Sequence, residues 1–232
     1  MTVFVLVHSP SVGPATWQPV AEHLRKAGHQ VLVPSLLRVG DGEPPYWPRV
    51  VAAVRAGVAG LTANQPVVLV VHSNAGVFAP VLVDGLTQPV ASCLFADATV
   101  PPATGSTPLA EEEFLPFLRG LAGPDGRLPQ WTDWWSEDDV APMFPYDQVR
   151  RAVTAEQPRL PLAYYQERVP APAGWDDRPC GYLIFSAAYE RDADRARDRG
   201  WPVRATRGEH LHQVVDPDAV SLALIDLASS PR

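Results

Sequence analysis

The sequence predicts an α/β fold, with a mostly parallel central sheet, helices on both faces and an inserted helical lid. Short apolar runs alternate with stretches of helical periodicity over residues 1–100, and the same alternation resumes over residues 179–232. Between them, residues 101–178 are rich in proline and large aromatics and lack this alternation. Because strands that alternate with helices form parallel sheets, we expect one core domain built from the two flanking ranges, with residues 101–178 as the lid.

The expected strands of the core are short, apolar and rich in β-branched residues, which favours buried strands over helices. They lie at residues 2–7, 30–33, 66–71, 90–96, 181–186 and 201–204. The expected helices have apolar residues spaced three and four positions apart. They lie at residues 17–27, 48–60, 76–84, 189–199 and 217–228. Within the lid we expect no strand, and a helix at residues 111–121.

Composition and charge exclude several classes of protein. With 46% apolar and 19% charged residues, the chain is neither disordered nor a coiled coil. Its net charge of −7 argues against nucleic acid as a partner, and no apolar run approaches the roughly 20 residues of a membrane helix. Cys93 and Cys180 give no disulfide framework, and the N-terminus lacks the features of a signal peptide. We therefore expect a cytoplasmic protein without a membrane partner, and the sequence leaves the oligomeric state open.

A serine stands where an expected buried strand meets an expected helix, in the run Val71-His72-Ser73-Asn74-Ala75. A serine on such a turn projects from the sheet edge, and backbone N–H groups at the start of the helix can stabilise a developing oxyanion. The run is a degraded form of the motif G-x-S-x-G, with valine and alanine in place of the two glycines. It predicts Ser73 as a nucleophile, and the alternative is a serine that only caps the helix.

A histidine follows the last expected strand, in the run Gly208-Glu209-His210-Leu211-His212. A serine nucleophile needs a base that takes its proton, and a loop histidine at this place suits that role. We expect His210 to be the base, with His212 as its rival in the same loop.

These residues, in this order, resemble the α/β-hydrolase fold superfamily over nearly the whole chain. The resemblance includes an opening strand that ends in His8, the serine turn at Ser73, an inserted lid, and His210 seven residues before Pro217. It implies that Ser73 is the nucleophile and His210 the base, with an acid between them in the sequence.

Two positions compete for this acid. Members of the superfamily usually carry it after the strand expected here at residues 181–186, where this chain has alanines and Glu190 comes late. The other location in the family is the end of the preceding strand, which here holds Asp97. Ligand chemistry gathers at the carboxyl ends of parallel strands. We therefore favour Asp97, with Glu190 as the alternative.

The loop after the first strand departs from the family pattern. Members usually carry His-Gly-x there, and the N–H of x donates to the oxyanion together with the residue after the nucleophile, here Asn74. This chain has His8-Ser9-Pro10-Ser11 instead, and Pro10 has no N–H to donate. Either the Ser9 or Ser11 hydroxyl or the Ser11 N–H supplies the missing donor, or the loop is shifted by one residue, or the reaction forms no tetrahedral oxyanion.

The aromatic side chains of the lid predict a wide apolar pocket. Trp131, Trp134 and Trp135 share one side of a helical turn, and Tyr164 follows later in the lid. We expect these four residues to line the pocket and to favour a medium-sized hydrophobic substrate. No His, Cys, Asp and Glu cluster has metal-ligand spacing and no glycine-rich phosphate loop follows a strand, so we expect no metal and no cofactor.

Three functions compete on these observations. The leading one is a serine hydrolase that cleaves an ester, thioester or lactone through an acyl-enzyme on Ser73. The second is a lyase or cyclase-type tailoring enzyme that uses Ser73 and His210 as an acid–base pair, which the unusual first loop favours. The third is a non-catalytic protein that binds a small apolar ligand in the same pocket.

Overall fold

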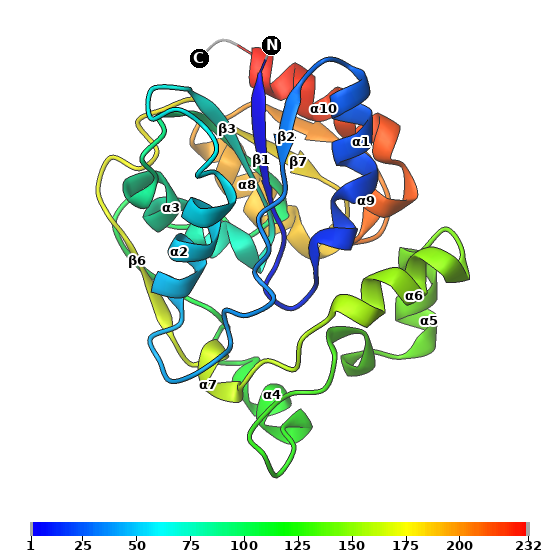
Figure 1. Ribbon diagram of the computed structural model, residues 1–232. Helices are drawn as coiled ribbons and strands as arrows, with labels where there is room; N and C mark the ends of the chain where they lie inside the picture. The colour runs from blue at the N-terminus through cyan, green and yellow to red at the C-terminus, as the bar shows by residue number, and fades with distance from the viewer. Residues whose placement is uncertain (1, 231–232) are drawn as a thin grey trace.

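The computed structural model describes residues 2–230 and places a wholly parallel sheet at the centre of the chain (Figure 1). The strand order in this sheet is β2-β1-β3-β4-β7-β8. Its strands are β1 (Val3–Val7), β2 (Gln30–Leu32), β3 (Val67–Ser73), β4 (Val90–Ala98), β7 (Cys180–Ile184) and β8 (Val203–Ala205). All six strands expected from the sequence are therefore confirmed, with ends that differ by a few residues.

Helices cover both faces of this sheet, as expected. Alternate residues of the central strands explain why: in β1, Phe4 and Leu6 pack on one side, and Val5 and Val7 pack on the other. The first side is covered by α1 (Gln18–Lys26) and α10 (Pro217–Ser229). The second is covered by α2 (Trp47–Gly57), α3 (Ala79–Gly85) and α8 (Glu190–Asp198). Strands that are apolar on both faces suit a buried parallel sheet.

The segment between β4 and β7, residues 99–179, is called the insert below. It carries α4 (Leu115–Leu121), η3 (Trp131–Trp134), α5 (Glu137–Val140), η4 (Ala141–Met143), α6 (Asp147–Glu156) and α7 (Leu162–Tyr165). Most of these helices lie together below and beside the sheet domain (Figure 1). The helix expected at residues 111–121 begins only at Leu115, because the residues before it form a turn in which Phe114 N–H donates to the Glu111 carbonyl oxygen at 2.9 Å.

The expectation of no strand in this segment is wrong. The strands β5 (Gly105–Pro108) and β6 (Arg168–Ala171) pair in antiparallel fashion and form a separate small sheet. Each is only four residues long and contains a proline, Pro108 or Pro170, which is tolerated in edge strands. Such strands lack the apolar alternation by which strands are recognised in a sequence.

Short helices complete the connections at the carboxyl end of the sheet. They are η1 (Pro14–Thr16), η2 (Asn74–Phe78), η5 (Ala187–Tyr189) and α9 (His212–Val215). The helix expected at residues 76–84 is divided into η2 and α3, because Pro80 lacks the N–H that a continuous helix requires and instead lies in the first turn of α3.

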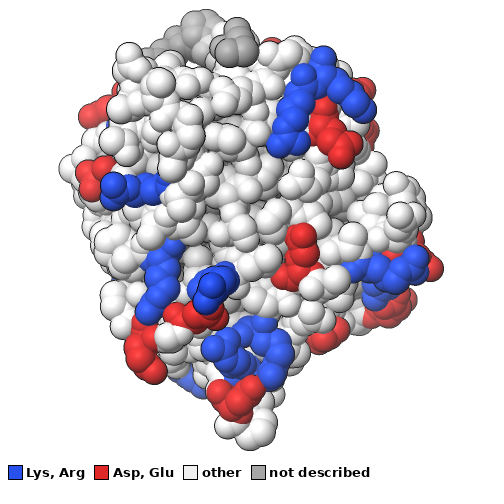
Figure 2. Space-filling model, viewed as in Figure 1, with Lys and Arg blue, Asp and Glu red and all other residues white. Residues whose placement is uncertain are grey.

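The surface seen in Figure 2 carries basic and acidic side chains next to one another. Within residues 2–230, no helix is both long and apolar enough to cross a bilayer.

We expect Gly76→Ala to destabilise the fold. Gly76 is buried in η2, and a methyl group on its Cα would overlap the backbone of Thr99 just after β4. Overpacking of this kind costs about 1–3 kcal/mol of unfolding free energy, measurable by urea denaturation. The matched control is Gly60→Ala at an exposed position with open space around it, which we expect to be nearly neutral. Equal stability of the two variants would contradict this packing argument.

Candidate active site

Ser73 ends β3 in a strained conformation that turns its side chain out of the sheet. Its φ is 60° and its ψ is −133°, in a region that residues other than glycine seldom occupy. The next residue, Asn74, opens η2, so its N–H is one of the first donors of that helix and has no acceptor within it. The local geometry is that of a strand–turn–helix elbow, which exposes the serine hydroxyl at the carboxyl edge of the sheet.

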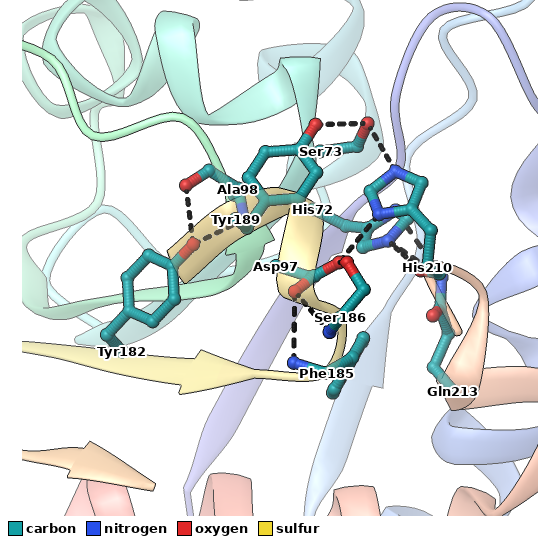
Figure 3. A network of polar contacts seen from close by, with 10 residues as sticks. All are labelled: His72, Ser73, Asp97, Ala98, Tyr182, Phe185, Ser186, Tyr189, His210 and Gln213. Atoms are coloured by element: carbon teal, nitrogen blue, oxygen red, sulfur yellow. Dashed lines mark hydrogen bonds and ion pairs between the residues drawn. The ribbon is translucent and has the colours of Figure 1, made fainter. Parts of the chain in front are cut away.

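Three residues far apart in the sequence meet at this edge (Figure 3). His210 Nε2 lies 2.9 Å from Ser73 Oγ, and His210 Nδ1 lies 2.7 Å from Asp97 Oδ2. Because the carboxylate accepts from Nδ1–H, Nε2 is left as the acceptor for the serine hydroxyl. The structure thus brings together the three residues that the sequence favours, in the geometry of a Ser-His-Asp triad.

Asp97 is completely buried and its carboxylate is fully hydrogen-bonded. Besides His210, it accepts from the Phe185 N–H at 2.9 Å, the Ser186 N–H at 3.0 Å and the Ser186 hydroxyl at 2.6 Å. Burial alone raises the pKa of Asp97, but the hydrogen bond and charge of His210 and the Ser186 donors outweigh it, so the pKa lies below its usual value. The carboxylate is therefore ionised at neutral pH.

The His210 ring lies between two other rings. His72 stacks on it with ring centroids 4.7 Å apart, and Tyr189 stacks on it at 4.9 Å with an interplanar angle of 9°. His72 Nε2 lies 3.0 Å from the His210 carbonyl oxygen, so its N–H donates to the backbone of the same residue. Burial, and then the charge of His210, lower the pKa of His72 to about 3. His72 therefore stays neutral and holds His210 in place.

The alternative candidates lie elsewhere. The Glu190 carboxylate forms an ion pair with Arg197 on the surface, 3.1 Å away along α8, so the structure places Asp97 and not Glu190 against His210. The His212 ring packs on Phe185, with ring centroids 5.8 Å apart, while His210 is the histidine at Ser73.

The loop after β1 carries two serines that line the same cavity as Ser73. His8 is buried and fixes the loop: its Nδ1–H donates to the Ser9 carbonyl oxygen at 2.8 Å and its Nε2 accepts from the Leu36 N–H at 3.0 Å. The Ser11 N–H points to Ser9 Oγ at 3.3 Å. Ser11 Oγ lies 2.6 Å from the Tyr165 hydroxyl. Ser9 and Ser11 face the cavity beside Ser73, whereas Pro10 is buried outside its lining.

A cavity of about 750 Å³ lies over the triad, between the sheet edge and the insert. Its aromatic lining consists of Phe114, Trp131, Trp134, Trp135, Tyr165 and Tyr189. The three tryptophans therefore lie where the sequence predicts, although Trp135 is 37% exposed at the mouth.

Tyr164 does not line this cavity, which corrects the sequence prediction. Its ring is fully buried against Phe78 and Tyr46, and its hydroxyl donates to the Asn74 side-chain oxygen at 2.7 Å. In the short helix α7 neighbouring side chains point in different directions, so the adjacent Tyr165 faces the cavity instead.

Sequence reasoning also missed Ser186, Tyr189 and Tyr165. Ser186 lies two residues after the end of β7, and its hydroxyl gains a role only because Asp97 lies opposite, 2.6 Å away. In the sequence the two tyrosines cannot be told from ordinary buried aromatic residues, because nothing there indicates where their hydroxyls point.

Comparison with known proteins identifies the class. The model of the alpha/beta hydrolase family matches residues 4–223, so the chain belongs to this family. No curated protein matches the sequence closely enough to count as a relative.

Solved structures share the fold at low sequence identity. An extracellular α/β-hydrolase from a Paenibacillus species superposes with a TM-score of 0.76 at 16% identity, over 99% of this chain and 100% of that one. Polyneuridine aldehyde esterase superposes with a TM-score of 0.72 at 15% identity, over 99% and 100%. A variant of tomato methylketone synthase I superposes with a TM-score of 0.71 at 16% identity, over 98% and 97%. Their names describe different activities, so the likeness defines the fold and not the reaction.

Within residues 2–230, no three His, Cys, Asp or Glu side chains gather into a possible metal site. The expectation that the protein works without a metal or cofactor stays a prediction.

We expect the unfolding free energy to fall as the pH is lowered from 7 to 5. Burial lowers the pKa of His8 to about 4 and that of His72 to about 3, from an ordinary value of 6.5. Both rings therefore bind a proton near pH 6.5 only in the unfolded chain, and their contribution to stability is complete above that pH and is lost below it. The loss amounts to about 2 kcal/mol for each histidine.

Urea denaturation at several pH values measures this slope. His8→Asn lowers the overall stability but is expected to remove about half of the pH dependence between pH 7 and 5. An unchanged slope in this variant would show that His8 is not a neutral buried group.

Proposed function

We propose that this protein is a serine hydrolase that cleaves a carboxylic ester, thioester or lactone of a medium-sized hydrophobic substrate. One observation carries the proposal: Ser73 Oγ lies 2.9 Å from His210 Nε2 under an aromatic cavity, while His210 Nδ1 is held by a buried, ionised carboxylate. Structural neighbours that are named as esterases support the same reading.

The reaction follows from the positions of the groups. As Ser73 Oγ attacks the carbonyl carbon, its proton passes to His210 Nε2, and Asp97 stabilises the resulting imidazolium. When the tetrahedral intermediate collapses, the bond to the alcohol oxygen breaks and that oxygen takes the proton from His210. Water then repeats the sequence on the acyl-enzyme, with His210 as base, and releases the acid and free Ser73.

The oxyanion needs two donors. The Asn74 N–H at the start of η2 provides one. We place the second on a hydroxyl of Ser9 or Ser11, because both face the cavity beside Ser73 and Pro10 has no N–H. The Tyr165 hydroxyl, 2.6 Å from Ser11 Oγ, holds that side chain in position.

The insert supplies the aromatic wall of the cavity, and we propose that it acts as a lid over Ser73. We also retain the cytoplasmic location that the sequence predicts.

The test is covalent labelling with a fluorophosphonate, followed by intact mass. We expect a single adduct on the wild type and none on Ser73→Ala or His210→Ala. Asp97→Asn should lower the kcat of ester hydrolysis by about 10³–10⁴, because the His210 ring loses the acceptor that fixes its tautomer.

A folded wild type without an adduct would contradict the acyl-enzyme mechanism. It would favour the second candidate, a lyase or cyclase-type reaction with Ser73 and His210 as acid–base pair. The missing N–H at Pro10 is the observation that supports this candidate, and a neighbour named methylketone synthase fits it. Retained ligand affinity in Ser73→Ala with no turnover in the wild type would favour a binding protein.

We expect uncharged substrates to be preferred over anionic ones. The charged residues in the described lining are Glu111 and Asp139, and neither Lys nor Arg is among them. A substrate carboxylate would lose water in an aromatic cavity without gaining a cation. The kcat/KM for 4-nitrophenyl butyrate should exceed that for the 4-nitrophenyl monoester of succinate by about tenfold or more.

Glu111→Gln should reduce this preference. Its matched control is Glu112→Gln, a neighbouring exposed residue outside the lining, which should leave the preference unchanged. Equal rates for the two esters in the wild type would contradict the prediction.

A further inference from the structure

Tyr189 is placed at the reacting atoms by three separate contacts. It ends η5, directly after β7, and its half-buried side chain lines the cavity. Its ring is parallel to the His210 ring, and its hydroxyl lies 3.4 Å from Ser73 Oγ (Figure 3). The hydroxyl of Tyr189 and Nε2 of His210 therefore both face the same serine oxygen.

The direction of the hydrogen bond follows from the rest of the triad. The single proton of the Ser73 hydroxyl is committed to His210 Nε2, at 2.9 Å, so the Tyr189 O–H donates to Ser73 Oγ. Burial raises the pKa of Tyr189 far above its ordinary value, so the hydroxyl keeps its proton. A bond of 3.4 Å is longer than an ordinary O–H···O bond and leaves the donor free to serve a better acceptor.

The order of the strands in the sheet indicates which oxygen of the substrate accepts this hydrogen bond from Tyr189. The neighbours of β3 are β1 on one side and β4 on the other, with β7 beyond β4. The Ser9 and Ser11 hydroxyls come from the β1 side, whereas Tyr189 comes from the β7 side together with the ring of His210 on which it stacks. The oxygen that receives the proton of His210 Nε2 is that of the leaving alcohol.

We propose that the Tyr189 hydroxyl donates a hydrogen bond to the leaving oxygen as the bond between carbonyl carbon and alcohol oxygen breaks. The electron pair of that bond moves to the alcohol oxygen, which takes a proton from His210 Nε2, and Tyr189 keeps its own proton throughout. In the second half of the reaction, the attacking water occupies the place that the alcohol left, and Tyr189 donates to its oxygen. This inference rests on the proposed hydrolase function and names a further catalytic residue for it.

The test compares two esters of butyric acid whose leaving oxygens differ in basicity, and therefore in how strongly a hydrogen-bond donor stabilises them. Ethyl butyrate releases a basic alkoxide oxygen, whereas 4-nitrophenyl butyrate releases a weakly basic phenolate. The kcat/KM of each ester reports the acylation step. Tyr189→Phe should lower it about 10²-fold for the ethyl ester and only about tenfold for the 4-nitrophenyl ester.

Two controls separate this effect from damage to the site. Tyr189→Phe keeps the ring on His210, and a fluorophosphonate releases fluoride, so the variant should be labelled at the wild-type rate. Tyr146→Phe, a matched change at a residue that is 63% exposed and outside the cavity, should leave both esters unaffected.

Equal losses for both esters, no loss for either, or slowed labelling of Tyr189→Phe would overturn the role at the leaving oxygen. A wild type that hydrolyses neither ester and takes no label would instead overturn the proposed function, and this inference with it.

Discussion

The buried carboxylate of Asp97 is the constraint on which the rest of the site depends. A charge with no exposed surface is stable only when its oxygens are fully hydrogen-bonded. Asp97 meets this requirement with donors from the two residues after β7 and from the loop that carries His210. The same bonds therefore fix the end of β4, the end of β7 and the orientation of the His210 imidazole. The positive φ of Asp97, 43°, is the local strain that accompanies this arrangement.

The neutral charge state of His72 also suits the role proposed for His210. In the proposed mechanism, a second cation 4.7 Å from the His210 ring would oppose the positive charge that His210 gains when it accepts the serine proton. His72 stays neutral because it is buried, and it uses its N–H to bond the His210 backbone. The imidazole is thus held by one ionised and one neutral partner, and both charge states suit the role of base that we propose for His210.

The sequence is sufficient to predict those site residues that the sheet itself positions. It is not sufficient for residues whose role depends on the direction in which the side chain points. Ser73 and Asp97 lie at the ends of β3 and β4, and His210 follows β8. Parallel strands bring their carboxyl ends to one edge, so a linear pattern is sufficient to place these residues. Tyr164 and Tyr165 are adjacent in a short helix, and only three-dimensional packing decides which of them faces the cavity. The strands β5 and β6 were missed because four-residue strands with prolines carry no periodic signal.

In the proposed site, side-chain hydroxyls stand on both sides of Ser73, and those of Ser9 and Ser11 take the place of one backbone N–H of the usual family pattern. Ser9 and Ser11 stand on the β1 side, where Pro10 cannot donate, and Tyr189 stands on the β7 side. A backbone N–H is fixed by the fold, whereas a hydroxyl turns about its bond and must be held by a further contact. Tyr165 holds Ser11, and the parallel stack on His210 holds Tyr189. In the proposed function, the aromatic residues of the cavity therefore both line the substrate site and orient the hydroxyls that donate to the substrate.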